Sequence, residues 1–139
     1  MDLTQNIISK DIILIKMDTK KIPFKKETDK VSFKSIAKYS IKNNKDGQVI
    51  ILLKINSGFV PEIFLNVKFE FIANIKFESP VKDSDIQENI EDILYPLGSR
   101  ISYLISVITR EMDGDNLIVP PSIDEYMCLK EDETDLEQK

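Results

Sequence analysis

Residues 62–78 read EIFLNVKFEFIANIKFE, and every second residue from Ile63 to Phe77 is apolar. This period of two is typical of a β-strand with one buried face. The strand would span roughly 50 Å, whereas most strands have about 5 or 6 residues. A chain of 139 residues offers little sheet to hide such a face. We therefore expect a helix of the same chain, a second copy of the chain or a bound non-native protein to cover it.

Composition limits the size and the chemistry of the protein. With 139 residues, 42% of them hydrophobic, the chain can form one cored domain, which we place at residues 1–130, followed by a mobile acidic tail at 131–139. The sequence has no histidine and one cysteine, Cys128, which excludes disulfide frameworks, Cys/His zinc sites and imidazole chemistry. It also has no Gly-rich phosphate loop. We expect no metal, no cofactor and no enzymatic activity.

Charge is divided unevenly along the chain. Residues 1–79 carry 14 of the 19 basic side chains, and residues 80–139 carry 15 of the 24 acidic ones. The lysines alternate with apolar residues and do not cluster with stacking aromatics, so nucleic-acid binding is disfavoured. The N-terminal residues lack the pattern of a signal peptide, and the longest apolar run, 49–53, is too short to cross a bilayer. We expect a cytoplasmic protein without membrane insertion.

Four segments of the first 80 residues have strand patterns. Residues 12–17 form a short apolar run that continues irregularly toward Phe24, and residues 31–42 alternate between apolar and polar. Residues 49–55 are apolar on both faces, which predicts a central strand, and residues 62–78 form the fourth strand. Turn-forming residues at 43–47 and 57–61 separate the strands. The pattern predicts an antiparallel sheet built largely of hairpins.

After Pro80 the apolar period changes to about 3.6, which predicts a long amphipathic helix. Ser84 followed by Gln87 resembles a capping box at its start. Pro96 and Gly98 predict a kink or a short break in the middle rather than two independent helices, and Gly114 predicts its end.

The apolar stretch 117–121 ends in two prolines, which favour extended backbone. Ser122 and Glu125 again resemble a capping box and predict a short second helix. The fold class predicted is therefore α+β: a four-stranded antiparallel sheet, a long kinked helix and a short C-terminal helix.

Two stretches resemble the SecB family of protein-export chaperones. They are ILYPLGSRISYLISVITR at residues 93–110 and LIVPPSID at residues 117–124. They are similar to the family's aliphatic-aromatic-proline helix centre, its arginine-bearing helix end and its proline-containing turn. The resemblance extends loosely from Ile8 to Met127.

The resemblance implies a SecB-like fold that assembles as a homodimer or as a dimer of dimers, a homotetramer. It also implies that non-native client proteins bind in long apolar grooves, and that the motor ATPase of protein export is a partner. Candidate residues for a partner-binding tail are Glu131, Asp132 and Glu133.

Candidate client-binding residues are apolar side chains on the irregular link, the turn, the second face of the fourth strand and the last helix: Ile22, Phe24, Phe59, Val60, Phe64, Ile123, Tyr126 and Met127. Ordinary core or interface packing is the alternative for each of them. The apolar stripe of the long helix is the candidate for self-association, with core packing as its alternative: Leu94, Leu97, Ile101, Leu104, Ile105 and Ile108.

Three functions fit these patterns. The first is an ATP-independent holdase that keeps client proteins unfolded for export or delivery. The second is a dedicated interaction module of the same fold that binds one protein, such as a toxin–antitoxin component. The third is a structural subunit whose grooves are closed by its own tail.

Overall fold

A computed structural model of the chain describes residues 3–22, 32–60, 64–114 and 116–128. The elements in chain order are η1 (Leu3–Asn6), β1 (Ile7–Ile22), β2 (Ser32–Lys45), β3 (Gln48–Val60), β4 (Phe64–Phe77), α1 (Asp83–Glu88), α2 (Ile90–Ile93), α3 (Pro96–Asp113) and β5 (Glu125–Cys128).

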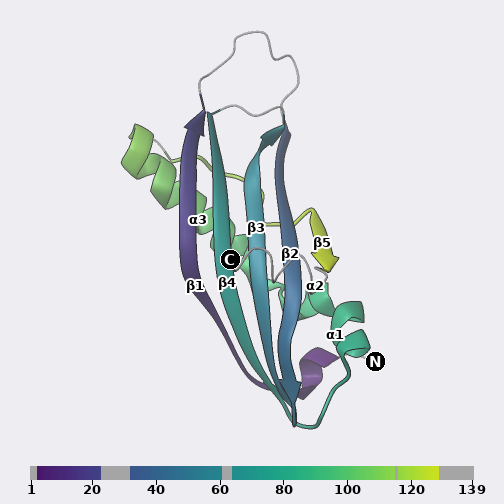
Figure 1. The fold of residues 1–139 in the computed structure, drawn as a ribbon. Helices are drawn as coiled ribbons and strands as arrows, with labels where there is room; N and C mark the ends of the chain where they lie inside the picture. Colours follow the sequence, from purple (N-terminus) through teal and green to yellow (C-terminus); the bar gives the residue numbers. More distant parts are fainter. Residues whose placement is uncertain (1–2, 23–31, 61–63, 115, 129–139) are drawn as a thin grey trace, which may run out of the picture.

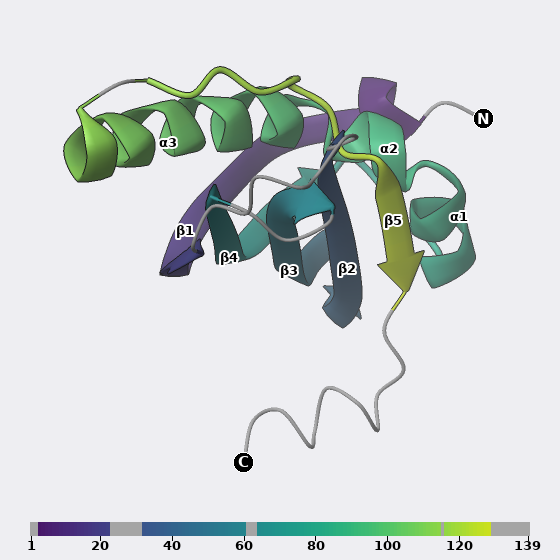
Figure 2. The ribbon, with the colours of Figure 1, turned by 90° about the horizontal axis from the view of Figure 1, so that it is seen from above.

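Five strands form a single sheet in the order β1-β4-β3-β2-β5. The first four are antiparallel neighbours, and β5 pairs with β2 in parallel. Figures 1 and 2 show the helices on one face of this sheet, and no described helix or strand covers the other face. We call this second face the open face. The prediction of an α+β fold with a central third strand is confirmed, but the sheet has a fifth strand.

Strand β4 carries the apolar file that the sequence predicts. Its core-facing side chains are buried: Leu65, Val67, Phe69, Phe71, Ala73, Ile75 and Phe77. Five helical side chains are also fully buried in the same core, namely Ile86, Ile93, Leu97, Ile101 and Ile105. The long apolar face is therefore covered by helices of its own chain.

Strand β1 is longer than the run at 12–17 suggested, and it contains two irregularities. Its pairing with β4 shifts register between Ile7 and Ser9 and again between Leu14 and Lys16. Each shift inserts one residue, Ile8 and Ile15, that breaks the alternation of faces. Because the bulges interrupt the period of two, the sequence pattern did not show the full strand.

The hairpin between β2 and β3 turns at Asp46 and Gly47, whose φ values are 54° and 83°. Two positive φ values in a two-residue loop are the geometry that residues 43–47 predict. The turn predicted at 57–61 is wrong in part, because Ser57 and Phe59 still pair with β2. The connection to β4 lies after Val60.

The predicted long helix is divided into three pieces. Lys82, rather than Ser84, is the N-cap, and it makes no side-chain capping bond, so the predicted capping box is wrong. Asn89 ends α1, with its side-chain amide donating to the Asp85 carbonyl at 2.8 Å. Pro96 begins α3 because it has no N–H to continue a preceding helix, so the predicted central break is confirmed. Gly114 ends α3 at φ 85°, also as predicted.

Gly98 lies inside α3 and does not interrupt it. A Cβ atom at this position would lie 2.6 Å from the Pro121 carbonyl oxygen, so glycine is needed for close approach of another segment. After Gly114 the chain returns along α3: the Thr109 hydroxyl accepts from the Leu117 N–H, and the Ser102 hydroxyl donates to the Val119 carbonyl, each at 2.8 Å.

The predicted C-terminal helix is wrong, because residues 125–128 form the strand β5. Asp124 explains the difference. Its N–H donates to the Ser35 carbonyl at 2.8 Å, and its carboxylate accepts from the Ser35 N–H at 2.7 Å. These two bonds align the following residues with the outer edge of β2, whose unpaired backbone groups then receive a partner.

Candidate functional site

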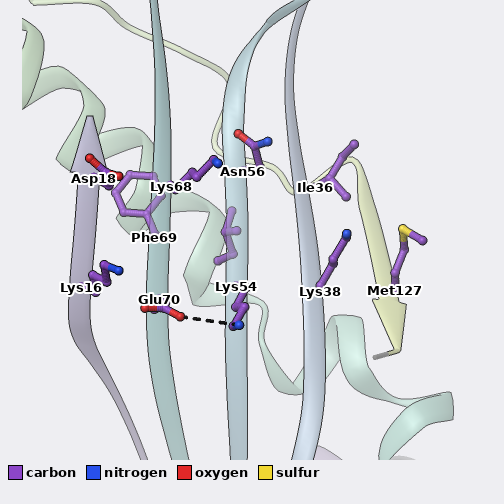
Figure 3. A pocket seen from close by; sticks show the side chains of 11 residues that line it. Lys16, Asp18, Ile36, Lys38, Lys54, Asn56, Lys68, Phe69, Glu70 and Met127 are labelled. Atoms are coloured by element: carbon purple, nitrogen blue, oxygen red, sulfur yellow. Dashed lines mark ion pairs between the residues drawn. The ribbon is translucent and has the colours of Figure 1, made fainter. Parts of the chain in front are cut away.

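The open face of the sheet contains a hollow of about 540 Å³, which we call the lysine hollow. Figure 3 shows that each of the five strands contributes to it, with Lys16 on β1, Lys68 on β4, Lys54 on β3, Lys38 on β2 and Met127 on β5. The complete lining is Lys16, Asp18, Ile36, Lys38, Lys54, Ile55, Asn56, Lys68, Phe69, Glu70 and Met127.

Strand register determines how the charges of the lysine hollow are arranged. Lys38 is paired directly with Lys54, Lys54 with Glu70, and Glu70 with Lys16. The Lys54 ammonium lies 3.8 Å from a Glu70 carboxylate oxygen, with both side chains partly exposed, a geometry that contributes about 1 kcal/mol or less. Four lysines and two carboxylates give the hollow a net positive charge, which suits an anionic ligand.

An apolar row crosses the open face beside the lysine hollow. Register places Leu52 of β3 opposite Ile72 of β4, and Ile72 opposite Ile13 of β1. Leu52 and Ile72 are half-buried, and Ile13 is exposed. This row continues the apolar surface toward the edge strand.

Strand β1 forms one edge of the sheet, and it carries large apolar side chains in contact with solvent. Ile8, Ile13, Ile15 and Met17 are between 41% and 58% exposed. Ile8 and Ile15 are the two bulged residues. We call these four residues the β1 edge. Ile13 lies on the open face, whereas Met17, paired with the buried Phe69, lies on the helix-covered face. Exposed apolar groups on an edge strand are typical of a polypeptide-binding surface.

Three of the candidate client-binding residues pack onto the core. Phe59 contacts Phe33 edge to face, with ring centroids 5.3 Å apart, and Ile123 and Tyr126 are half-buried against the core. Met127 is 44% exposed and lines the lysine hollow. Because β5 is a strand, Tyr126 and Met127 point to opposite faces of the sheet, so they do not form the single apolar side predicted for a helix.

The side chains of the four remaining client-binding candidates lie outside the part of the chain that the structure describes. The backbones of Ile22 and Phe64 are paired across β1 and β4, and Val60 is paired with Ser32, but their side chains lie outside the described residues. Phe24 and the tail residues Glu131, Asp132 and Glu133 are also outside the described residues.

The helical stripe predicted for self-association covers the chain's own sheet. Leu94, Leu97, Ile101 and Ile105 are at most 2% exposed, and Leu104 and Ile108 are partly buried against the same core. The four most buried residues pack in the core of one subunit, which is the alternative that the sequence left open. Self-association through this stripe stays a prediction.

Tyr126 is the most perturbed titratable group described. Burial, with the nearby negative charge of Glu91, raises the pKa of Tyr126 to about 12. Burial also raises the pKa of Tyr39, with Cys128 as a further cause. Both phenols therefore stay neutral to a higher pH than an exposed tyrosine, because burial favours the neutral form.

Sequence reasoning missed Arg100 as a link between helix and sheet. Its guanidinium lies 5.3 Å from the Phe71 ring centroid, and it donates to the carbonyl of Ile12. Arg100 thus attaches α3 to β4 and β1 together. Its position in the SecB-resembling stretch was the available signal, but periodicity alone gives no contact between a helix and a particular strand.

No family model matches the sequence, and no curated protein matches it. Solved structures do resemble it. The SecB-like chaperone Rv1957 of Mycobacterium tuberculosis, in complex with a ChAD peptide from the antitoxin HigA1, superposes with a TM-score of 0.65 at 11% identity, covering 84% of this chain and 91% of that chain. This chain has the SecB-like fold. A protein of unknown function from Streptococcus agalactiae shares the fold less closely, with a TM-score of 0.52 at 14% identity over 80% of this chain and 94% of that one.

The SecB-like fold that the sequence predicts is therefore confirmed. Across the described ranges, no group of three or more His, Cys, Asp or Glu side chains could hold a metal ion. In the same ranges, no helix has the length and apolar character needed to cross a membrane.

Proposed function

We propose that this SecB-like protein is an ATP-independent holdase that binds extended segments of non-native polypeptides. The observation that carries the proposal is the β1 edge, where four large apolar side chains are exposed on an unpaired side of the sheet. An extended client segment can add to such an edge through backbone hydrogen bonds, which read no sequence, and place its apolar side chains on the exposed isoleucines. The SecB-like chaperone whose fold is similar is itself bound to a peptide.

The test is client capture by the full chain. Size exclusion with light scattering is measured for the protein alone and after mixing with an unrelated protein diluted from denaturant. Co-elution with a soluble client supports the holdase. Ile13→Asp with Ile15→Asp is expected to weaken capture by roughly tenfold or more, since each side chain contributes on the order of 1 kcal/mol of apolar burial.

Ile118→Asp is the matched control for that variant. Ile118 is 77% exposed but lies on the segment that returns along α3, away from the sheet edge. Its substitution should leave capture unchanged. If both variants lose capture equally, binding depends on general surface hydrophobicity and the β1 edge is not the site.

A second candidate function is a dedicated module for one partner protein, such as an antitoxin. The similarity to a chaperone bound to an antitoxin peptide favours it. In that case the protein ignores unrelated unfolded chains and binds one partner tightly, and the same chromatography separates the two functions.

We also propose that the protein delivers its clients to the motor ATPase of protein export. It would do so in the cytoplasm, as a homodimer or a homotetramer. The support for this proposal is the acidic tail, with Glu131, Asp132 and Glu133 as candidate contacts. Neutralising these three carboxylates should weaken binding of the motor and leave client capture intact. Loss of client capture instead would contradict this division of roles.

A further inference from the structure

The lysine hollow holds four lysines and two carboxylates, so positive charge is in excess there. Lys38 and Lys54 are directly paired across β2 and β3, and like charges at paired positions destabilise a sheet. Glu70 is paired with Lys54 and also with Lys16, and Asp18 is paired with Lys68, so two carboxylates face four lysines. The Lys54 ammonium forms an ion pair with Glu70 in this hollow.

Lysines extend beyond the hollow along the same face. Lys34 is paired with Gly58, Gly58 with Asn66, and Asn66 with Lys20, which adds an exposed lysine at each end of the next row. The open face is thus basic although the whole chain has a net charge of −5. A basic surface on an acidic protein indicates a local electrostatic function.

The chain carries a complementary segment immediately after β5. Residues 129–139 read LKEDETDLEQK, with five carboxylates against two lysines, and they lie outside the described residues. Four of the carboxylates occupy alternate positions, at Glu131, Glu133, Asp135 and Glu137. In an extended conformation, alternate side chains share one side, so such a segment could present a row of carboxylates to the lysines.

The geometry allows this segment to reach the hollow. Met127, two residues before the segment begins, already lines the hollow. Adjacent strands are about 4.8 Å apart, so β5 and β1 are separated by roughly 19 Å. Eleven residues can span up to about 36 Å. A tethered segment also has an effective local concentration of about a millimolar or more.

We propose that residues 129–139 bind in the lysine hollow of their own chain, with their alternate carboxylates paired to Lys16, Lys38, Lys54 and Lys68. The segment then occupies the open face as an internal, salt-sensitive ligand. Its carboxylates are held by the chain's own lysines and are withheld from any other basic partner until competition or high salt releases them. This assignment does not depend on client binding at the β1 edge.

Zero-length carbodiimide cross-linking of the full chain, followed by mass mapping of the joined peptides, tests the proposal. Cross-links from the acidic segment are expected at Lys68 and Lys16, three and four strands away from β5. Lys82 is the discriminating control. It lies just before α1, whose Gln87 contacts Cys128 at 3.6 Å, so an undocked segment would react there and at Lys38, which is paired with Met127. At about 1 M salt, where screening acts over about 3 Å, the cross-links to Lys16 and Lys68 should largely disappear.

An equal mixture of isotope-labelled and unlabelled chains separates the possible occupants. Cross-linked peptides that are wholly light or wholly heavy support docking within one chain. Mixed pairs would show that a second copy supplies the segment, and preferential reaction at Lys82 would show that it does not dock, so either result overturns the proposal.

A charge variant of the segment provides an independent readout in folded protein. Glu131→Gln, Glu133→Gln, Asp135→Asn and Glu137→Gln together should shift the backbone amide resonances of Lys54 and Lys68. The exposed Glu88→Gln and Glu111→Gln substitutions change charge on the helices and should leave those resonances in place. Unchanged resonances at both lysines in the segment variant would also overturn the assignment.

Discussion

Asp124 controls the path of the C-terminal residues through two hydrogen bonds to Ser35. Asp124→Ala removes the carboxylate acceptor and leaves the partly buried Ser35 N–H without its partner. We expect a loss of roughly 1–3 kcal/mol in the free energy of unfolding and faster amide exchange at Ser35 and residues 125–128. Urea unfolding and hydrogen exchange measure the two effects.

Glu125→Ala is the control for that substitution, because Glu125 is exposed on the same strand. It should change stability by no more than about 0.5 kcal/mol. If the two variants behave alike, β5 is held by its backbone pairing with β2 and Asp124 does not position it.

Tyr126 makes stability sensitive to alkaline pH. Its pKa is about 12 in the folded protein and about 10 when unfolded. A raised pKa favours the native state fully below pH 10, and this contribution is lost as pH rises from about 10 to 12, because the unfolded state releases the phenolic proton first. Between about pH 10 and 12, the free energy of unfolding should therefore fall less for Tyr126→Phe than for the native sequence. Urea midpoints at successive pH values measure this difference.

Tyr39 provides the comparison, because burial raises its pKa as well. Some alkaline destabilisation should thus remain in Tyr126→Phe and decrease further in the double variant with Tyr39→Phe. An identical pH profile for Tyr126→Phe and the native sequence would exclude the burial that we describe for this phenol.

Among the elements, α3 depends on the absence of a side chain at Gly98. In Gly98→Ala the new methyl group would meet the Pro121 carbonyl at 2.6 Å, so the returning segment must move. Although alanine favours helix, we expect a net destabilisation of about 1–3 kcal/mol. Thermal unfolding measures it. Ser99→Ala, at the neighbouring exposed position, should be neutral or slightly stabilising.

The elements also show which patterns predict structure from sequence. The alternation in β4 and the 3.6-residue period after Pro80 each reflect one buried face, and both were interpreted correctly. The segment after Ser122 was not, because its local capping pattern favours a helix while the edge of β2 and the bonds to Ser35 favour a strand. Tertiary pairing outweighed local preference there, and a single sequence does not show which edge is unpaired.

The candidate site was less predictable than the fold, because it too depends on which strands are paired. Lys16, Lys38, Lys54 and Lys68 are separate solvent-facing positions in the sequence, and they come together only when strand order and register are known. Two of the exposed isoleucines at the β1 edge occupy bulges, which sequence alternation does not reveal. Burial of the Leu94–Ile105 stripe, by contrast, follows directly from its helical period.

At the scale of the molecule, the sheet is most securely held at its centre. β3 and β4 are each paired on both sides and provide most of the fully buried strand residues. We expect their amides to exchange only through global unfolding, while those on the outer side of β1 and in β5 exchange through local opening. Native-state hydrogen exchange measures this order. Equal protection of β5 and β3 would show that the edge is fixed by contacts beyond its four pairs.

The two edges of the sheet differ, and this difference limits how copies of the chain can add to one another by strand pairing. Fibre growth by strand addition requires two open edges on each unit, one to receive the preceding copy and one to offer to the next. Here β5 occupies part of the outer edge of β2, and β1 is the long edge that stays open in the described sheet. Edge association through β1 would then be self-limiting, closing at a symmetric pair. The four-residue strand β5 thereby hinders the growth of fibres by a protein that exposes isoleucine on its other edge.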